Sequence, residues 1–294
     1  MPATQYDLHS HSIASDGTLT ALQLVRRACE KGVDVLALTD HDTTVGLGEA
    51  RIEAARCGLT LVNGVEISVS WGHETIHLVG LNIDPVAPEL GEGLKSLRQF
   101  RRWRAEEIGR RLAKKGVGGA CEGAEQLAGG QIVSRTHFAR FLVAEGYARS
   151  LRDAFRRFLV RGKPGHVPGE WAGLEAAVSW VRSAGGQAVV AHPARYRMTN
   201  TKLKVLLGEF SDCGGLGIEV VSGSHSADDC RYMARLANAF GLLASRGSDY
   251  HGPENAWVEL GRMAELPADV VPIWSGWTDQ PGAANSAGRD GCSQ

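Results

Sequence analysis

Residues 7–17 read DLHSHSIASDG, and His9 and His11 stand two positions apart within this strand-like run. Side chains alternate between the two faces of a strand, so both imidazoles point to the same side and can bind one metal ion. Asp16 follows in the same stretch. An HxH pair alone is a weak signal, so its meaning depends on the rest of the chain.

Five further clusters of metal-binding side chains follow, each at the end of a strand-like run. They lie in LTDHD (38–42), GVEIS (64–68), HLVG (77–80), AHPAR (191–195) and GSDYHG (247–252), and they supply His41, Glu66, His77, His192, Asp249 and His251. The six imidazoles and three carboxylates exceed the needs of one ion, since a catalytic zinc uses about three protein ligands and a water. Clusters able to hold two or three ions mostly catalyse hydrolysis, above all of phosphate esters. The pattern therefore predicts an enzyme.

Burial in an apolar core is the alternative role for His41, His77 and His192. Packing alone rarely places three histidines so that each ends an apolar run, so we interpret all three as ligands. Asp249 and His251 repeat the period-two spacing near the other end of the domain. We therefore expect the first and last strands to meet at one metal cluster.

The order of strand-like and helix-like runs predicts a barrel-like α/β fold. The first ninety residues alternate strand and helix, and residues 34–42 and 59–68 are typical of buried parallel strands. The helix between Ser15 and Asp34 has Thr18 or Thr20 available as its N-cap. The alternation resumes after Val178, with strands in 186–193, 215–223 and 241–252 and helices over 201–212 and 227–240. About seven strands are expected, with the active site at their carboxyl ends.

Residues 98–167 interrupt this alternation with helix-like, basic sequence. Eight Lys and Arg face two Glu between Arg98 and Lys115, and the same excess recurs between Arg135 and Lys163. Two interpretations remain open: an ordinary solvated helical surface, or a cap whose inward-facing cations hold an anionic substrate. We therefore divide the chain into a barrel (1–97 and 168–271), a helical insertion (98–167) and a small, polar tail (272–294) that is expected to be disordered.

Bulk composition narrows the class of protein. A formal net charge of −1 predicts no general attraction to nucleic acid or membrane. The six cysteines form no CxxC pair and are interpreted as reduced thiols. The N-terminus lacks the pattern of a signal peptide, and no apolar run approaches the length of a membrane span. A cytoplasmic protein is expected.

Taken together, the six motifs resemble those of the PHP (polymerase and histidinol phosphatase) family of metal phosphoesterases, over roughly residues 1–85 and 175–260. The motif order and the basic insertion are similar to a subgroup of bacterial 3′,5′-nucleoside bisphosphate phosphatases and 5′-trimming exoribonucleases. The resemblance implies a distorted (β/α)7 barrel with a trinuclear metal site.

The resemblance also implies how the ligands are shared. His9, His11, Glu66 and Asp249 hold the first ion; Glu66 bridges to a second ion shared with His77 and His192; Asp16, His41 and His251 hold the third. Some relatives have histidine where this chain has Asp16. The additional oxygen donor favours Mn²⁺, with Zn²⁺, Fe²⁺ or Mg²⁺ as alternatives.

The candidate substrate-binding residues carry weaker signals. Ser134 and Arg135 open a predicted helix, where backbone amides and a guanidinium can bind a phosphate together. Arg195 follows a predicted ligand, and Lys163 lies in a loop that leads back to the barrel. A plain surface charge is the alternative for all three cations. His137 either faces the site or braces the insertion. His225, with Ser222, Gly223 and Ser224, follows a strand end and is a candidate for substrate contact and for the general acid.

The predicted reaction is metal-dependent hydrolysis of the 3′-phosphate of 3′,5′-nucleoside bisphosphates, such as adenosine 3′,5′-bisphosphate to AMP, with short 5′-phosphorylated RNA as a further substrate. Hydrolysis of histidinol phosphate is the alternative within the enzyme class. A non-catalytic, metal-supported PHP module is the alternative outside it, and the full ligand set disfavours that reading. No DNA-binding motif is visible, and no protein partner is inferred.

Overall fold

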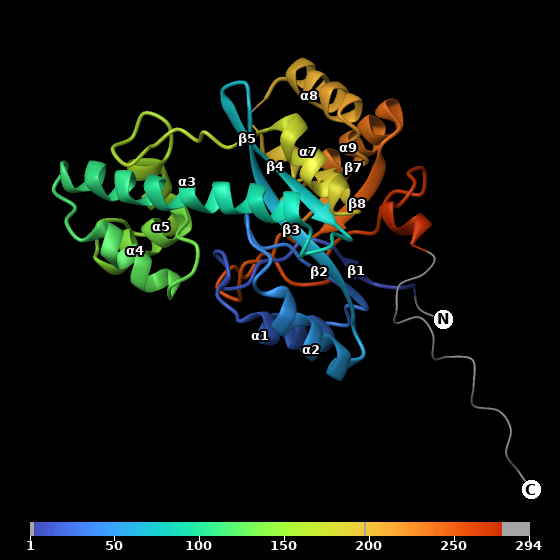
Figure 1. The fold of residues 1–294 in the computed structure, drawn as a ribbon, viewed down its shortest axis with the longest axis horizontal. Coiled ribbons are helices and arrows are strands. Elements are labelled where there is room, and N and C mark those ends of the chain that lie inside the picture. The colour runs from blue at the N-terminus through green and yellow to red at the C-terminus, as the bar shows by residue number, and fades with distance from the viewer. Residues whose placement is uncertain (1–2, 197, 278–294) are drawn as a thin grey trace, which may run out of the picture.

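The computed structural model describes residues 3–196 and 198–277 (Figure 1). Its strands are β1 (Tyr6–Asp7), β2 (Val35–Leu38), β3 (Thr60–Trp71), β4 (Glu74–Leu81), β5 (Ala172–Gly173), β6 (Gln187–Val190), β7 (Gly217–Ser222) and β8 (Leu243–Gly247). Its α-helices are α1 (Ala21–Glu30), α2 (Leu47–Cys57), α3 (Pro88–Ala113), α4 (Ala120–Ala128), α5 (Arg135–Ala144), α6 (Leu151–Ala154), α7 (Leu174–Ser183), α8 (Asn200–Asp212) and α9 (Ala227–Phe240). Short 3-10 turns occupy Pro193–Arg195 and Ile273–Gly276, and Phe155–Leu159 form a single-turn π-helix.

The strands form one sheet in the order β1-β2-β3-β4-β6-β7-β8, and β5 pairs with β3. All pairings along this path are parallel except those of β4, which runs antiparallel to both β3 and β6. Simple strand and helix alternation was therefore the wrong expectation for the region of β3 and β4. Gly72 adopts a φ of 56°, which suits the two-residue turn that joins these strands as a hairpin.

Hydrogen bonds between the residues after β1 and the end of β8, with the residues that follow it, bring the two edges of the sheet together. The Leu8 amide donates to Arg246 over 3.0 Å, the Asp249 amide donates to His9 over 2.9 Å, and the His11 amide donates to Tyr250 over 2.9 Å. The sheet is consequently a nearly closed barrel, and the distorted α/β barrel predicted from the sequence is confirmed. Closure also places the HxH motif beside the Asp249–His251 motif.

Capping side chains define where several helices begin. Thr20 caps α1 in a capping box with Gln23. Of the two N-caps predicted for this helix, Thr18 and Thr20, the structure therefore uses Thr20. Ser134 caps α5, so the helix start predicted there is confirmed. Helices α8 and α9 begin and end within one residue of the predicted ranges.

Apolar side chains fill the barrel and its outer face as separate clusters. Leu8, Val62 and Ile273 belong to the cluster inside the barrel. A larger cluster packs α7, α8, α9 and the first half of α3 against the sheet, and a third lies under α1 and α2. Among the described residues, no helix combines the length and the apolarity needed to span a bilayer.

The chain that follows the barrel is ordered further than the sequence predicted. Ile273 is fully buried, and the ring of Trp274 stacks on Tyr6 with 4.1 Å between centroids. Burial of these apolar groups holds residues 272–277, the first part of the predicted tail, against the barrel. The disorder predicted for residues 278–294 concerns a segment outside the described residues.

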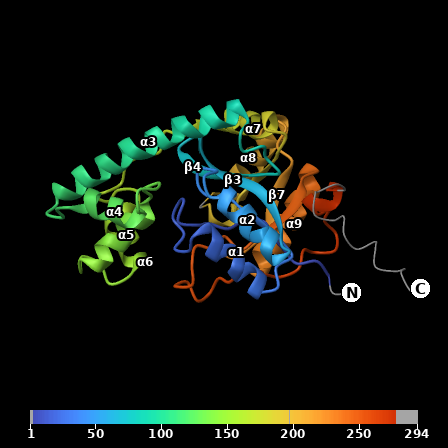
Figure 2. The same cartoon turned by 60° about the horizontal axis from the view of Figure 1, so that its bottom comes forward.

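Helix α3 connects the barrel to the insertion, and Figures 1 and 2 show it as a long rod that extends from the barrel to α4, α5 and α6. Pro88 begins it, a position where a missing amide hydrogen costs little. Leu90 and Leu94 pack into the barrel's outer core, whereas Ile108 and Leu112 pack into the insertion's own core. The predicted boundary at 98 therefore falls inside one continuous helix.

Candidate metal centre and substrate cavity

All nine candidate ligands converge at one end of the barrel. Most of them follow strands: His9 and His11 come after β1, His41 after β2, His192 after β6, and Asp249 with His251 after β8. Glu66 and His77 lie inside β3 and β4, so the expectation that every ligand ends a strand is wrong for these two. The β3–β4 hairpin pairs Ser68 with His77, which brings His77 next to Glu66.

The Glu66 carboxylate lies at the centre of the group and is fully buried. Its Oε1 lies 2.9 Å from Nδ1 of His77 and 3.0 Å from Nε2 of His192. Its Oε2 lies 2.8 Å from Nδ1 of His41, 3.3 Å from Nε2 of His11 and 3.4 Å from Nε2 of His9. The two oxygens thus face different histidines, as a bridging carboxylate requires.

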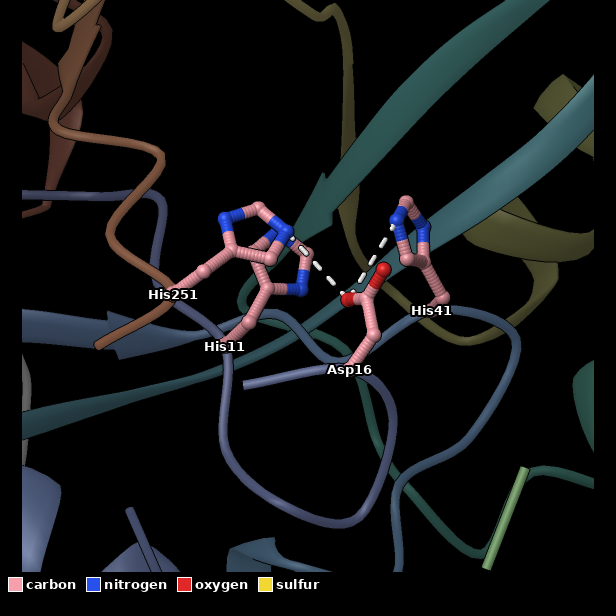
Figure 3. A group of neighbouring side chains, drawn as sticks. All are labelled: His11, Asp16, His41 and His251. Carbon is pink, nitrogen blue, oxygen red and sulfur yellow. Dashed lines mark ion pairs between the residues drawn. The ribbon is translucent and has the colours of Figure 1, made fainter. Parts of the chain in front are cut away.

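The other two carboxylates lie at the edges of the same cluster. Asp16 Oδ1 lies 3.2 Å from Nε2 of His251 and 3.8 Å from Nε2 of His41. Figure 3 marks these two ion pairs with dashed lines. Asp249 Oδ1 lies 3.2 Å from Nε2 of His11 and 3.6 Å from Nε2 of His9. Three groups have ligand atoms within 4.8 Å of one another: His11 with Asp16, His41 and His251; His9 with His11 and Glu66; His41 with Glu66 and His77.

Unpaired buried atoms indicate that the cluster fits bound cations. Within the described residues, Glu66 Oε2, Asp16 Oδ1 and His41 Nδ1 are buried and make no hydrogen bond. Buried polar atoms without partners destabilise a fold, whereas a metal ion would satisfy all of them. Imidazole and carboxylate donors suit Mn²⁺, Fe²⁺ and Zn²⁺.

The electrostatics of the cluster keep its carboxylates ionised. Burial raises the pKa of Asp16, Glu66 and Asp249, but the charges of the neighbouring histidines lower it by more. The pKa of each carboxylate is therefore well below its usual value. Burial lowers the pKa of His11, but the adjacent carboxylates of Asp249 and Glu66 outweigh this effect and raise the pKa to about 10. Positive charge is thus strongly favoured among these groups.

A second layer of side chains holds the candidate ligands in place, and sequence reasoning missed it. Glu219 Oε1 accepts a hydrogen bond from Nδ1 of His9 over 2.6 Å, and its Oε2 accepts the His192 amide over 2.5 Å. Asp40 accepts hydrogen bonds from Ser12 and Ser15 in the loop that carries Asp16. Such partners orient metal ligands and raise their basicity. The available signal was a glutamate inside the apolar run of β7.

Backbone strain is concentrated at the same place. Asp42, His192 and Asp249 are three of the four described non-glycine residues with positive φ angles, at 52°, 30° and 56°. Non-glycine residues rarely adopt such angles, and they persist where the surrounding structure imposes them, often at functional sites. Two of the three are candidate ligands, and Asp42 follows a third.

The cluster opens into a cavity of about 180 Å³, here called the substrate cavity. Its walls include four arginines and two aromatic rings: Arg101, Arg104, Arg135, Arg195, Phe155 and Trp171. The sequence predicted Arg135 and Arg195 at the site and missed the others. The basic run from Arg98 to Lys115 was the available signal, and the structure shows that part of it faces inward.

The four arginines differ in their partners. Arg101 donates to Asp42 over 2.6 Å and to Ser68 over 2.8 Å, and Arg195 donates to Asp249 over 2.5 Å. Among the described residues, Arg104 donates only to the carbonyl of Val167, over 3.2 and 3.0 Å. Arg135 makes no hydrogen bond or ion pair within the described part of the chain, and its guanidinium lies 5.9 Å from the ring centre of Phe155.

The cavity is therefore electropositive away from the cluster. Burial, together with the charges of Arg135 and Arg101, lowers the pKa of Arg104 to about 9. Burial also lowers the pKa of Arg135, and the charge of Arg101 adds to this effect. An anion placed between Arg104 and Arg135 would relieve this repulsion.

Four predicted substrate-binding residues lie elsewhere. Lys163 is exposed and does not line the cavity. His137 is buried, and its Nδ1 accepts the Ser134 amide, so it braces α5. Ser222 is also buried, and its Oγ lies 3.5 Å from that of Ser224. His225 accepts the Ala194 amide over 3.4 Å, and its Nδ1 lies 3.1 Å from the Val220 carbonyl.

These placements follow from the hydrogen bonds that each side chain makes. Both ring nitrogens of His225 are used inside the protein, so it supports the turn between His192 and Arg195. Ser134 lines the cavity as predicted, and its hydroxyl lies 3.2 Å from Oδ2 of Asp16. Thr136 makes a similar contact with Asp16 over 3.0 Å.

Comparison with known proteins agrees with this geometry. A model of the PHP domain matches residues 7–113. The 3′,5′-nucleoside bisphosphate phosphatase of Chromobacterium violaceum is 49% identical over 91% of this chain and 94% of that protein. The 5′-3′ exoribonuclease Rnm of Escherichia coli is 47% identical over 95% of each chain.

A solved structure gives the same result for the fold. It is described as an amidohydrolase from Chromobacterium violaceum with bound sulfate and no metal. It aligns with a TM-score of 0.88 at 48% identity, over 92% of this chain and 95% of that one. Similarity of this degree along nearly the whole chain shows common ancestry, and the protein belongs to the PHP family.

Proposed function

We propose that the protein is a metal-dependent phosphoesterase that removes the 3′-phosphate from 3′,5′-nucleoside bisphosphates and also trims short 5′-phosphorylated RNA. The observation that carries this proposal is a cluster of nine candidate ligands that opens into a cavity walled by four arginines. The cluster supplies a place for hydrolysis, and the arginines supply a place for a second anion. The names of the similar proteins agree with both parts.

Three sets of residues would hold the ions. The first comprises His9, His11, Glu66 and Asp249; the second Glu66, His77 and His192; the third Asp16, His41 and His251. Bound divalent ions would supply Lewis acidity for activating water and for neutralising charge on the phosphoryl group. We propose Mn²⁺ as the resident metal, because Asp16 adds an oxygen donor to the third set.

The substrate would be oriented by its two phosphates. The 3′-phosphate meets the cluster, and the 5′-phosphate binds at Ser134, Arg135 and Arg104. Arg104 and Arg135 have no carboxylate partner among the described residues, and Ser134 caps the first turn of the ten-residue helix α5. Guanidinium groups and helix-terminal amides both favour phosphate.

Two aromatic rings offer flat surfaces for the base. Trp171 and Phe155 both line the substrate cavity. The guanidinium groups of Arg101 and Arg104 lie 5.0 Å and 5.4 Å from the ring centre of Trp171, which holds these side chains together. Stacking on an aromatic ring tolerates any base.

The leaving oxygen is protonated by water in this proposal. Apart from the candidate ligands, the cavity is lined only by serine, threonine, arginine and aromatic side chains, among the described residues. None of these is an acid suited to neutral pH. His225, the general acid considered from sequence, has both ring nitrogens engaged and does not line the cavity.

The two alternatives fit the cavity less well. Besides its phosphate, histidinol phosphate carries an ammonium group, which the four arginines would repel. A non-catalytic module has no need of a charged cavity beside a full ligand set. A cytoplasmic location suits a nucleotide substrate, and it also suits the free cysteines among the described residues.

The proposal is tested by loading the purified protein with Mn²⁺ and measuring phosphate release from adenosine 3′-, 5′- and 3′,5′-phosphates and from histidinol phosphate. We expect the highest kcat/KM with the 3′,5′-bisphosphate. A higher value with histidinol phosphate, or no turnover of any nucleotide, would refute the proposed function.

A further inference from the structure

A second cavity, of about 470 Å³, shares Arg101 with the substrate cavity. Its walls come from the loop after β2, from α3 and from the segment that precedes α5. Thr43, which lines it, lies two positions after the candidate ligand His41, and Val133 leads directly into Ser134. The two cavities are therefore neighbours that share the Arg101 side chain.

The walls of the second cavity combine apolar surface with cations. Val45 is 70% exposed, and Ile132 and Val133 are partly buried. Arg98, Arg101 and Arg102 line it, together with Glu106 and Glu125. Arg98 donates to the Asp42 carbonyl over 3.0 Å.

Arg102 is available to a ligand. It is exposed, and within the described residues it makes no hydrogen bond or ion pair. A volume of 470 Å³ lies within the range of about 300–1,000 Å³ that is usual for small-molecule sites. Apolar walls suit a nucleobase, and an unpaired guanidinium suits a backbone phosphate.

The proposed reaction creates a need for such a site when RNA is the substrate. Water oxygen forms a bond to phosphorus, and the bond from phosphorus to the 3′-oxygen of the first nucleotide breaks. A proton passes to that 3′-oxygen, and the phosphate stays on the 5′-oxygen of the next nucleotide. A nucleoside bisphosphate ends at the reacting phosphate, whereas RNA continues beyond it. The next nucleotide must therefore lie beside the metal cluster but outside the 5′-phosphate site.

We infer that the second cavity binds the nucleotide that follows the hydrolysed bond. Its base lies against Val45 and Ile132, and its 3′-phosphate, which links it to the next nucleotide, lies near Arg102. This inference rests on the proposed function, because it assumes that the first nucleotide occupies the substrate cavity. It assigns bisphosphate hydrolysis to one cavity and RNA trimming to both.

The test uses two exposed substitutions, Arg102→Glu and Val45→Asp, with Lys115→Glu as the control. Lys115 is an exposed cation just past the end of α3 that lines neither cavity. Each protein is assayed with Mn²⁺ on adenosine 3′,5′-bisphosphate and, for the first cleavage, on the 5′-phosphorylated trinucleotide pApApA, whose second nucleotide carries a 3′-phosphate. Binding of a fluorescent 5′-phosphorylated triadenylate to metal-free protein is measured separately by anisotropy.

Loss of the phosphate contact at Arg102, or of the base contact at Val45, predicts a fall of roughly tenfold in kcat/KM for pApApA and in triadenylate affinity. The ratio of pApApA to bisphosphate activity should fall by the same factor, and the control should match the wild type. Equal losses on both substrates, or unchanged triadenylate binding, would overturn the inference. A wild-type protein that hydrolyses neither substrate would refute the proposed function instead, and the binding measurement would still decide the role of the second cavity.

Discussion

Nδ1 of His9 lies 2.6 Å from Oε1 of Glu219, which is 210 positions further along the chain. The other oxygen of Glu219 accepts the amide of His192, so one buried carboxylate supports two candidate ligands that follow different strands, β1 and β6. The contact fixes the ring of His9 so that Nε2 faces Glu66 and Asp249. Glu219 is therefore a positioning residue for the metal cluster.

Glu219→Gln should lower metal affinity by about 10- to 100-fold, the usual effect of removing such a partner. The amide keeps the shape of the side chain but removes the negative charge behind His9. Metal content after dialysis and Mn²⁺ titration of activity would measure the effect, and excess Mn²⁺ should restore most of the turnover. Glu170→Gln, at an exposed position, is the control. Unaltered Mn²⁺ affinity would contradict the assigned role.

Glu66→Ala should unseat two of the proposed ions and abolish nearly all turnover. The reason is that each Glu66 oxygen faces a different set of histidines, and no other side chain in the described residues contacts both sets in this way. Elemental analysis and phosphate release would be measured on the same preparation. Near-normal activity in this variant would exclude Glu66 as a bridging ligand.

Arg135→Ala should reduce kcat/KM for 5′-phosphorylated substrates by roughly 10- to 150-fold, because a charge-assisted hydrogen bond contributes about 1.5–3 kcal/mol. A 3′-monophosphate lacks the 5′ group, so its loss should be much smaller. Lys163→Ala is the matched control, since Lys163 is exposed and lines no part of the cavity. Equal losses on both substrates would show that Arg135 supports the fold or the cluster instead.

Glu107→Gln should reduce stability near neutral pH, and the reduction should become smaller in acid. Hydrogen bonds from Arg110 and Arg111 lower the pKa of Glu107 to about 2 in the folded protein, below its ordinary value of 4.5. A lowered folded-state pKa gives stability that is fully present above the unfolded-state pKa and is lost as pH falls toward the folded-state value. The difference in Tm between wild type and variant should therefore be constant above pH 4.5 and shrink below it.

Thermal denaturation between pH 7 and pH 3.5 would measure this difference. Glu122→Gln, at an exposed position of α4, is the control and should follow the wild type at every pH. A Tm difference for Glu107→Gln that persists unchanged at the lowest pH would show that the ion pairs are not its cause.

The candidate ligands were predictable because their signal is local. Two histidines spaced by one residue face the same side of any strand, and the carboxyl ends of parallel strands meet at one edge. The helix starts at Thr20 and Ser134 were predictable for the same reason, since a capping side chain bonds to amides within its own turn. In both cases the residues that give the signal are close neighbours in the sequence.

The inward arginines were not predictable one by one. Arg101 and Arg104 face the cavity, whereas Arg102 between them is exposed. Helical periodicity separates these faces, but only the packing of α3 against the barrel decides which face points inward. His137 and His225 illustrate the same limit, because each follows a plausible motif and is then turned toward a backbone partner.

The sequence by itself determined the set of candidate ligands, the α/β class and the family, since these depend on residue types at short spacings. Only the tertiary structure decided that β4 runs antiparallel, that Glu219 stands behind His9, and that two cavities share Arg101. The physical reason is that these relationships join segments tens to hundreds of residues apart. Their contacts form only when the barrel closes and α3 packs against it.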